Sequence, residues 1–246
     1  MKQDDEAFSN SPTSIMAVSD FLSESRSHLS FGTTDNLTPK PLANRMVRGV
    51  LEGFSDEQLP HVRVLDPVCG TGIFLACSFD FLFSRLERQF PNPFKRAQHI
   101  YEKQLFGFDS SSVKTQLTRR FLDPRGTFDL NLHTLDFLKE DITMEFDAVV
   151  GNPPYNDASG SMIYDEFVFK ANEIADRTSF VIPARWTVTG RGTKRLREAV
   201  LNRELPAKSV DFISEKESGF TGVRVSGGYC ILHLESGFDG DLLVNG

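Results

Sequence analysis

Short runs of apolar residues alternate along the chain with longer segments whose apolar positions recur every three or four residues. The short runs are typical of buried strands, and the longer segments of helices with one apolar face. The predicted strands are residues 62–65, 105–109, 128–133, 146–150, 179–182, 209–213 and 229–234. The predicted helices are residues 39–53, 73–89, 93–104, 113–122 and 163–176, followed by a basic helix before residue 204. Because helices connect the early strands, we expect an α/β fold with a mostly parallel seven-stranded sheet and helices on both faces.

The fourth predicted strand ends in a stiff polar turn. The apolar run 146–150 and Gly151 are followed by Asn-Pro-Pro-Tyr at residues 152–155. Two consecutive prolines remove two backbone donors and fix φ twice, so they hold Asn152 and Tyr155 in place. Open α/β sheets bind ligands at this end of their strands. The simpler alternative is a proline-terminated strand with a solvated asparagine, and the motif alone leaves both open.

Acidic residues follow three other predicted strands. Asp66 begins the turn Asp-Pro-Val-Cys-Gly-Thr-Gly at residues 66–72, which leads into a long helix. Asp109 ends the next strand and Asp136 follows the third. One such acid is usually a helix or turn cap. Three acids at matching positions are better explained by one shared ligand site at the sheet edge.

The turn at residues 66–72 does not have the spacing of a phosphate-binding loop. It is not followed by Gly-Lys-Ser/Thr, and it is not GxGxxG. Gly70 and Gly72 allow positive φ and a close approach of a ligand to the backbone. An acid at the strand end suits a cationic or amine-bearing ligand without a pyrophosphate. The pattern therefore favours a sulfonium cofactor with an amino-acid tail.

Charge and composition exclude several classes of protein. With 27 Lys and Arg against 34 Asp and Glu, the net charge of −7 argues against a generally cationic nucleic-acid coat, so contact with nucleic acid should be a local patch. The sequence has no long apolar run that predicts a membrane-spanning helix, and residues 1–14 have no apolar segment that predicts a secretory signal. The 3 cysteines form no CxxC pair, which favours reduced thiols in the cytoplasm, and the 5 scattered histidines argue against a metal site. One basic cluster is either a solvated helix face or a phosphate-contacting patch: Arg191, Lys194, Arg195, Arg197 and Arg203.

Taken in order, the motifs resemble those of the γ class of adenine-N6 DNA methyltransferases from restriction–modification systems. The order is Thr38-Pro39, then Asp-Pro-x-x-Gly-Thr-Gly-x-Phe-Leu at residues 66–75, then Asn-Pro-Pro-Tyr. The family's later elements also match, at residues 180–186, at residues 196–198 and at Phe220. The resemblance covers about residues 31–236 and implies the Rossmann-like class I S-adenosylmethionine-dependent methyltransferase fold.

The resemblance implies a site for S-adenosylmethionine. Thr38, otherwise simply the N-cap of the following helix, would contact the methionine carboxylate of the cofactor, and Asp66 would bind its ammonium group. Asp109 would accept from both ribose hydroxyls. Asp136 would accept from the adenine amine beside Phe137, which donates its backbone N–H. The implied cofactor-binding residues are Thr38, Asp66, Pro67, Val68, Cys69, Gly70, Gly72, Asp109, Ser110, Asp136, Phe137 and Asn152.

The resemblance also implies an acceptor site for an adenine that is flipped out of DNA. The side-chain oxygen of Asn152 and the carbonyl of Pro153 would accept from the two hydrogens of the exocyclic amine. Tyr155 would stack on one face of the base and Phe220 on the other. The implied catalytic residues are Asn152, Pro153 and Tyr155, and the implied substrate-binding residues are Pro154, Phe220, Trp186, Arg185 and Arg224.

We expect two parts in this chain: a mobile arm with a possible helix at residues 1–30, and a catalytic domain at residues 31–246. Sequence-specific members of the family add a target-recognition domain, and only about ten residues follow Glu235. The chain is therefore either a catalytic portion that needs a separate recognition domain or subunit, or an enzyme with little sequence preference; its acidic balance favours the first. Asn-Pro-Pro-Tyr also suits protein glutamine or RNA, and a non-catalytic methyltransferase-like subunit is a third alternative.

Overall fold

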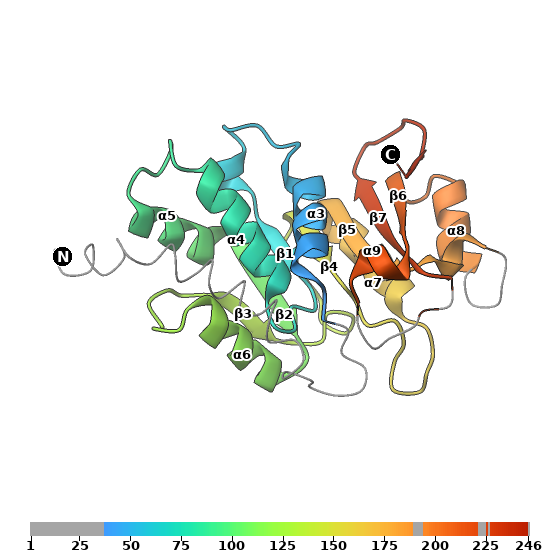
Figure 1. Cartoon of the computed structure of the whole chain (residues 1–246), viewed down its shortest axis with the longest axis horizontal. Coiled ribbons are helices and arrows are strands. Elements are labelled where there is room, and N and C mark those ends of the chain that lie inside the picture. The colour runs from blue at the N-terminus through green and yellow to red at the C-terminus, as the bar shows by residue number, and fades with distance from the viewer. Residues whose placement is uncertain (1–36, 189–193, 221–224, 226, 246) are drawn as a thin grey trace.

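The computed structural model describes residues 37–188, 194–220, 225 and 227–245, so the predicted arm at residues 1–30 lies outside the described part. These residues form one sheet of eight strands with helices packed on it (Figure 1). The spatial order of the strands is β3-β2-β1-β4-β5-β7-β6-β8. Their bounds are β1 Val64–Asp66, β2 Leu105–Asp109, β3 Asn131–Thr134, β4 Phe146–Gly151, β5 Ala175–Pro183, β6 Ala207–Ile213, β7 Tyr229–Glu235 and β8 Leu243–Val244.

The sheet is mostly parallel, as predicted. Strands β3, β2, β1, β4 and β5 pair in parallel, β7 is antiparallel to both β5 and β6, and β8 is parallel to β6. The predicted number of seven strands was wrong, because β8 adds an eighth at the outer edge of β6. Its two residues, Leu243 and Val244, are too few to give a periodic signal. The third strand starts at Asn131 and not at Phe128. The backbone N–H of Phe128 donates to the Asp123 carboxylate, so Phe128 belongs to the turn before the strand.

Helices cover both faces of the sheet, again as predicted. Their bounds are α3 Lys40–Leu51, α4 Ile73–Arg85, α5 Pro93–His99, α6 Ser112–Leu122, α7 Tyr164–Ile174, α8 Lys194–Leu201 and α9 Glu215–Ser218, with short helical turns at Leu59–His61, Ile100–Gln104 and Ala184–Thr187. Buried residues of α3, α4 and α5 share one core with alternate residues of the strands, and those of α7 and α8 share the other. Val64 and Val150 face the first core while Leu65 and Val149 face the second, as the period of two in a strand requires.

The first described helix starts one residue later than predicted. Pro39 is its N-cap, in an extended conformation with φ −61° and ψ 136°, and Lys40 is the first helical residue. The prediction that Thr38 caps this helix was therefore wrong. A residue before proline is held in an extended conformation, so Thr38 lies outside the helix and its side chain serves another purpose, described below.

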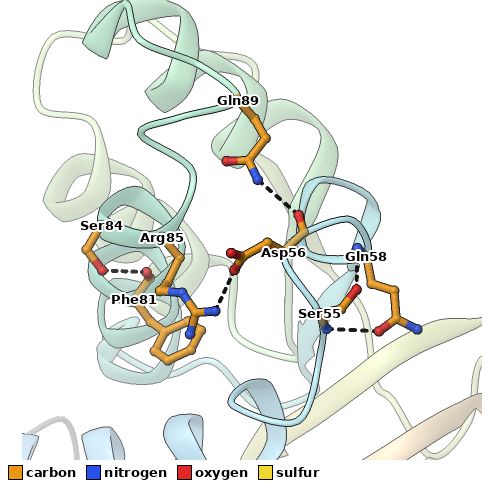
Figure 2. A network of polar contacts seen from close by, with 7 residues as sticks. All are labelled: Ser55, Asp56, Gln58, Phe81, Ser84, Arg85 and Gln89. Carbon is orange, nitrogen blue, oxygen red and sulfur yellow. Dashed lines mark hydrogen bonds and ion pairs between the residues drawn. The ribbon is translucent and has the colours of Figure 1, made fainter.

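A network of polar contacts fastens the segment between α3 and β1 to α4 (Figure 2). The guanidinium of Arg85 donates to Asp56 Oδ1 over 2.7 Å, and the side chain of Gln89 donates to the Asp56 carbonyl over 3.0 Å. Within the segment, the side chains of Ser55 and Gln58 each accept from the backbone N–H of the other. These contacts hold the chain just before β1 begins. Asp66 is the last residue of that strand.

None of the helices in the described ranges is both long enough and apolar enough to cross a membrane.

Candidate active site

The carboxyl ends of three neighbouring strands meet at one edge of the sheet. In the order β2-β1-β4, these ends carry Asp109, Asp66 and Gly151 with Asn152. A Cβ built at Gly151 would lie 3.1 Å from Asp66 Oδ1, so the Asp66 carboxylate lies directly beside the end of β4. The shared edge predicted from the strand-end acids therefore exists for Asp66, Asp109 and Asn152.

Asp66 is a buried carboxylate with one oxygen in use. Oδ1 accepts from the backbone N–H of Val68 over 3.2 Å, and only 1% of the residue is exposed. Among the residues that the structure describes, Oδ2 has no hydrogen-bond partner. Burial, and to a lesser degree the nearby charge of Asp109, raise the pKa of Asp66 well above its usual value. Asp66 therefore offers a strong, unused acceptor to a cationic group.

The glycine turn between β1 and α4 is built for close approach to its backbone. Gly70 and Gly72 have φ of 54° and 85°, in the left-handed region that disfavours other residues. A Cβ at Gly72 would come within 2.8 Å of the Thr118 methyl carbon, and the Thr118 hydroxyl donates to the Gly70 carbonyl over 2.7 Å. Thr118, from α6, thus fixes the turn from behind. Nothing in its helical surroundings signalled this role.

Pro67, Val68 and Cys69 belong to the same turn. The Cys69 N–H donates to the Phe108 carbonyl over 2.7 Å, which joins the turn to β2. Pro67 and Cys69 are buried, while Val68 is half-buried. Burial, then the charges of Asp66 and Asp109, raise the pKa of the Cys69 thiol well above its usual value. Cys69 is therefore a protonated packing residue at neutral pH and not a nucleophile.

Asp109 joins the end of β2 to the glycine turn. Its Oδ2 accepts from the Gly70 N–H over 3.0 Å and its Oδ1 accepts from the Ser111 N–H over 2.9 Å. Ser110 lies between these contacts and is exposed. Asp109 is 3% exposed, so its position is fixed by the turn on one side and by the start of α6 on the other.

Asp136 and Phe137 follow β3 and differ in their accessibility. The Leu135 N–H donates to the Asp109 carbonyl over 3.0 Å, which brings this segment to the same edge. Asp136 pairs with the exposed Lys139 over 2.8 Å, and this contact lowers its pKa. The ring of Phe137 is buried and stacks on Phe167 at 5.7 Å, so it packs in the core under the helix α7.

Asn152 is fixed by a residue that lies 114 positions earlier in the chain. Its Nδ2 donates to the Thr38 hydroxyl oxygen over 3.2 Å. Thr38 is 6% exposed, Asn152 is half-buried, Pro153 is buried and Pro154 is exposed. The structure thus brings the Thr-Pro element against the Asn-Pro-Pro-Tyr turn.

Aromatic rings surround the last residue of the turn. Tyr155 meets Tyr164 edge-on at 6.4 Å and Tyr229 at 6.2 Å, and Tyr229 in turn contacts Phe220 at 4.7 Å. Burial raises the pKa of Tyr155 well above its usual value, followed by the effects of Tyr229 and Cys230, whereas a hydrogen bond with the Asn152 side chain acts in the opposite direction. Tyr164 and Tyr229 were not predicted. Gly227 and Gly228, which directly precede Tyr229, were the available signal for a turn leading back to the site.

The remaining predicted residues divide into three cases. The Trp186 side chain is 3% exposed and its indole N–H donates to Cys230 Sγ over 3.2 Å, so it lies in the core and does not reach a substrate. The large apolar indole is stabilised by burial, although the sequence motif that contains Trp186 lies next to the site. Arg185, on the turn after β5, is exposed and interacts with Tyr164. Arg224 lies outside the described residues.

These residues fit the groups of S-adenosylmethionine. The unused buried oxygen of Asp66 suits an ammonium group, and the positive-φ glycines leave the backbone of the turn uncovered. In the described ranges, no group of three or more His, Cys, Asp or Glu side chains is placed to hold a metal ion.

Among proteins of known sequence, the chain is 25% identical over 111 residues to an uncharacterized adenine-specific methylase of Mycoplasma pneumoniae, which is 42% of this chain and 26% of that protein. It is 28% identical over 163 residues to the type II methyltransferase M.BstVI of Geobacillus stearothermophilus, which is 58% of this chain and 29% of that protein. The chain thus spans about a quarter of the length of the curated relatives that it matches.

Two solved structures show the same fold. One is a modification subunit of a putative type I restriction enzyme from Vibrio vulnificus, with a TM-score of 0.63 and 19% identity over 93% of this chain and 49% of that chain. The other is a putative class I S-adenosylmethionine-dependent methyltransferase from Listeria monocytogenes, with a TM-score of 0.61 and 14% identity over 95% of this chain and 73% of that chain. The predicted class I methyltransferase fold is therefore confirmed.

The family model for Eco57I restriction-modification methylases matches residues 85–220, more than half of the chain. The match includes Asp109, Asp136 and the Asn-Pro-Pro-Tyr turn, whose geometry is described above. The chain belongs to the Eco57I restriction-modification methylase family.

Proposed function

We propose that this chain transfers the methyl group of S-adenosylmethionine to the N6 amine of an adenine flipped out of DNA, as the catalytic portion of a modification enzyme. The observation that carries the proposal is the position of Asn152. Its carboxamide is anchored by Thr38 at the end of β4, and the preceding residue, Gly151, lies beside the buried carboxylate of Asp66. An acceptor for an amine and an acceptor for a cofactor ammonium are thus adjacent. The family and the adenine-specific relative support this assignment.

Asn152 and Pro153 act on the nucleophile. The exocyclic amine of adenine is a poor nucleophile because its lone pair is delocalised into the ring. The side-chain oxygen of Asn152 and the carbonyl of Pro153 accept from the two amine hydrogens, which favours a pyramidal nitrogen and stabilises its developing positive charge. No strong base is then needed, because the proton leaves after the transfer.

The cofactor supplies an electrophilic methyl group, and the chain has to align it with the amine. Asp66 binds the ammonium group with its unused oxygen, and the backbone of residues 67–72 follows the cofactor closely. Asp109 and Asp136 accept from the ribose and from the adenine amine, with the exposed Lys139 giving up its contact to Asp136. Positioning of this kind supplies a large part of the rate, since effective molarities in oriented reactions are high.

Tyr155 and Phe220 hold the flipped base. Tyr229 contacts both rings, which supports a common aromatic surface for one nucleobase. Base stacking on an aromatic ring contributes about 1–3 kcal/mol, which offsets much of the cost of unstacking the base from DNA. The raised pKa of Tyr155 keeps its hydroxyl protonated at neutral pH, so the ring meets the base uncharged.

We further propose that the chain works with a separate target-recognition domain or subunit. The matched regions make up only 26% and 29% of the two relatives, and the net charge of −7 gives this chain little general attraction to DNA. Arg185, exposed beside the site, and Arg224 are the cations that we assign to the DNA backbone. The 3 cysteines are buried and form no disulfide with one another, and we propose a reducing, cytoplasmic setting for the chain.

The test is labelled-methyl transfer from S-adenosylmethionine to DNA, RNA and protein in parallel, alone and with added lysate of the source cells. We expect label in DNA only, and its loss in Asn152→Ala. Asn156→Ala, which changes an exposed asparagine four residues later, is the matched control and should keep the label. Label in protein or RNA instead of DNA would contradict the assignment of the acceptor.

A further inference from the structure

The contact between Thr38 and Asn152 joins two segments that lie 114 residues apart in the sequence. Asn152 Nδ2 donates to the Thr38 hydroxyl oxygen over 3.2 Å, and Thr38 is 6% exposed. A hydrogen bond between side chains from segments this far apart requires both backbones to be held in place. Thr38 is not used as a helix cap, because Pro39 occupies that position.

Thr38 is held by the elements on both sides of it. Pro39 restricts the backbone of Thr38 to an extended conformation, and α3 follows at once with its apolar face buried against the sheet. From the opposite side, a Cβ at Gly219 would lie 3.1 Å from Pro39 Cγ, so the loop that carries Phe220 packs on the proline. The Thr38 hydroxyl is therefore a fixed point at the acceptor site.

The orientation of the Asn152 carboxamide decides whether it presents an acceptor or a donor. The group is planar, so holding Nδ2 against Thr38 directs Oδ1 to the opposite arm. A carboxamide turned by 180° would present N–H groups to an amine that needs acceptors. A hydroxyl can accept or donate, and in this structure the Thr38 hydroxyl accepts from Asn152 Nδ2. The Tyr155 side chain forms a second hydrogen bond with the Asn152 side chain.

We propose that Thr38 is a positioning residue, whose hydroxyl holds the Asn152 carboxamide in the orientation that methyl transfer requires. This role goes beyond the cofactor contact that the family resemblance implies for Thr38. Its kinetic consequence rests on the proposed function, whereas its structural consequence does not.

The structural consequence is tested by NMR of the cofactor-free chain labelled with 15N-asparagine. The side-chain NH₂ signal of Asn152 is identified by its disappearance in Asn152→Ala. We expect Thr38→Val and Thr38→Ala to shift this signal toward the position of a solvated asparagine and to speed its hydrogen exchange by about tenfold or more. Thr38→Ser, which keeps the hydroxyl, should retain the wild-type signal, as should Thr127→Val at an exposed turn. An unchanged Asn152 signal in a folded hydroxyl-free variant would overturn the proposal.

The kinetic consequence is tested by single-turnover methyl transfer into unmethylated bacterial DNA at saturating S-adenosylmethionine, with the recognition partner fractionated from lysate of the source cells present in every reaction. Cofactor affinity is measured separately by calorimetry. We expect the hydroxyl-free variants to lose about 10- to 100-fold in rate after saturation, because a misplaced acceptor group costs this much. Thr38→Ser should recover most of that loss. Reduced cofactor affinity with an unchanged rate at saturation would assign Thr38 to the cofactor alone and overturn the proposal.

The two experiments separate this proposal from the proposed function. If the wild-type chain methylates no DNA but the Asn152 signal still depends on the Thr38 hydroxyl, the positioning role stands and the assigned acceptor is wrong. If DNA is methylated and the signal and the saturated rate ignore the hydroxyl, the function stands and the positioning role is wrong.

Discussion

The carboxylate of Asp109 binds the glycine turn that follows a different strand: its Oδ2 accepts from the Gly70 N–H over 3.0 Å. The cofactor turn and the expected ribose-binding acid are thus one connected unit before any ligand arrives. A carboxylate held in this way needs little reorganisation on binding, which reduces the entropic cost of association.

Replacing Asp109 should therefore weaken both the fold and the cofactor site. In Asp109→Ala the N–H groups of Gly70 and Ser111 lose their acceptors, and we expect the free energy of unfolding to fall by about 1–3 kcal/mol. We also expect cofactor affinity in calorimetry to fall at least tenfold. Asp129→Ala, at an exposed acid, is the control and should change neither. Unchanged affinity in a folded Asp109→Ala chain would mean that the ribose site is misplaced.

Gly72 should tolerate no side chain, for two separable reasons. Its φ of 85° disfavours any Cβ, and that Cβ would lie 2.8 Å from the Thr118 methyl carbon. Gly126 has a comparable φ of 65° but nothing within 4 Å. In urea unfolding, Gly126→Ala measures the backbone cost alone, about 1 kcal/mol. Gly72→Ala should cost more, by about a further 1–3 kcal/mol, and adding Thr118→Ser should recover part of the difference. Equal costs for the two glycines would show that Thr118 does not confine the turn.

Asp66 should destabilise the cofactor-free chain at neutral pH. Its folded pKa is raised by burial, so its contribution to stability is present below the unfolded pKa near 3.8 and is lost as pH rises through the folded pKa. We expect Asp66→Asn to raise the free energy of unfolding at pH 7 by about 1–3 kcal/mol, with a smaller gain at acidic pH. Cofactor affinity should fall by about 10- to 100-fold, since a charge-assisted hydrogen bond is lost. Lower stability of Asp66→Asn at pH 7 would contradict this explanation.

His233 should make the fold sensitive to mild acid. The side chain of His233 lies under α3, where a Cβ at Gly49 would be 2.6 Å from its Cε1. Burial lowers the pKa of His233 from 6.5 to about 4. Among its charged neighbours, Asp211 raises this pKa, whereas Arg45 and Lys208 lower it further. Between these two pKa values the unfolded chain binds more protons than the folded one, so stability falls as pH decreases from about 6.5 to 4.

The loss assigned to His233 is up to about 3 kcal/mol. His233→Gln should remove this part of the pH dependence in thermal unfolding. His61→Gln, at an exposed histidine, should leave it intact. The same slope in His233→Gln and in the wild-type chain would show that His233 is not the titrating group.

Much of the fold was predictable because its strands are short apolar runs that end abruptly. The runs before Asp66 and Asp109 could be predicted as strands, and parallel crossovers then bring their ends to one edge. The stiff turn after β4 was predictable from its two prolines. The two-residue β8 was not, because its pairing depends on β6 and leaves no pattern in its own sequence.

The errors within the site concern side chains whose partners lie far away in the sequence. Thr38 has the sequence pattern of a helix cap, yet its partner Asn152 lies 114 residues later. Trp186 lies in a motif beside the site, yet its indole packs into the core against Cys230. Periodicity and local motifs depend on neighbours within a few residues in the sequence. They therefore do not predict which distant residue such a side chain contacts in the fold.

The central claim, transfer to the N6 amine of adenine in DNA, is tested most directly by identifying the methylated nucleoside. DNA is treated with the chain, a recognition partner fractionated from lysate of the source cells, and labelled S-adenosylmethionine. It is then digested to nucleosides and analysed by mass spectrometry. We predict that all label elutes as N6-methyl-2′-deoxyadenosine and that Asn152→Ala abolishes it. Label in N4-methylcytosine or 5-methylcytosine, or label that survives Asn152→Ala, would contradict the assignment of the acceptor base and of the residue that prepares it.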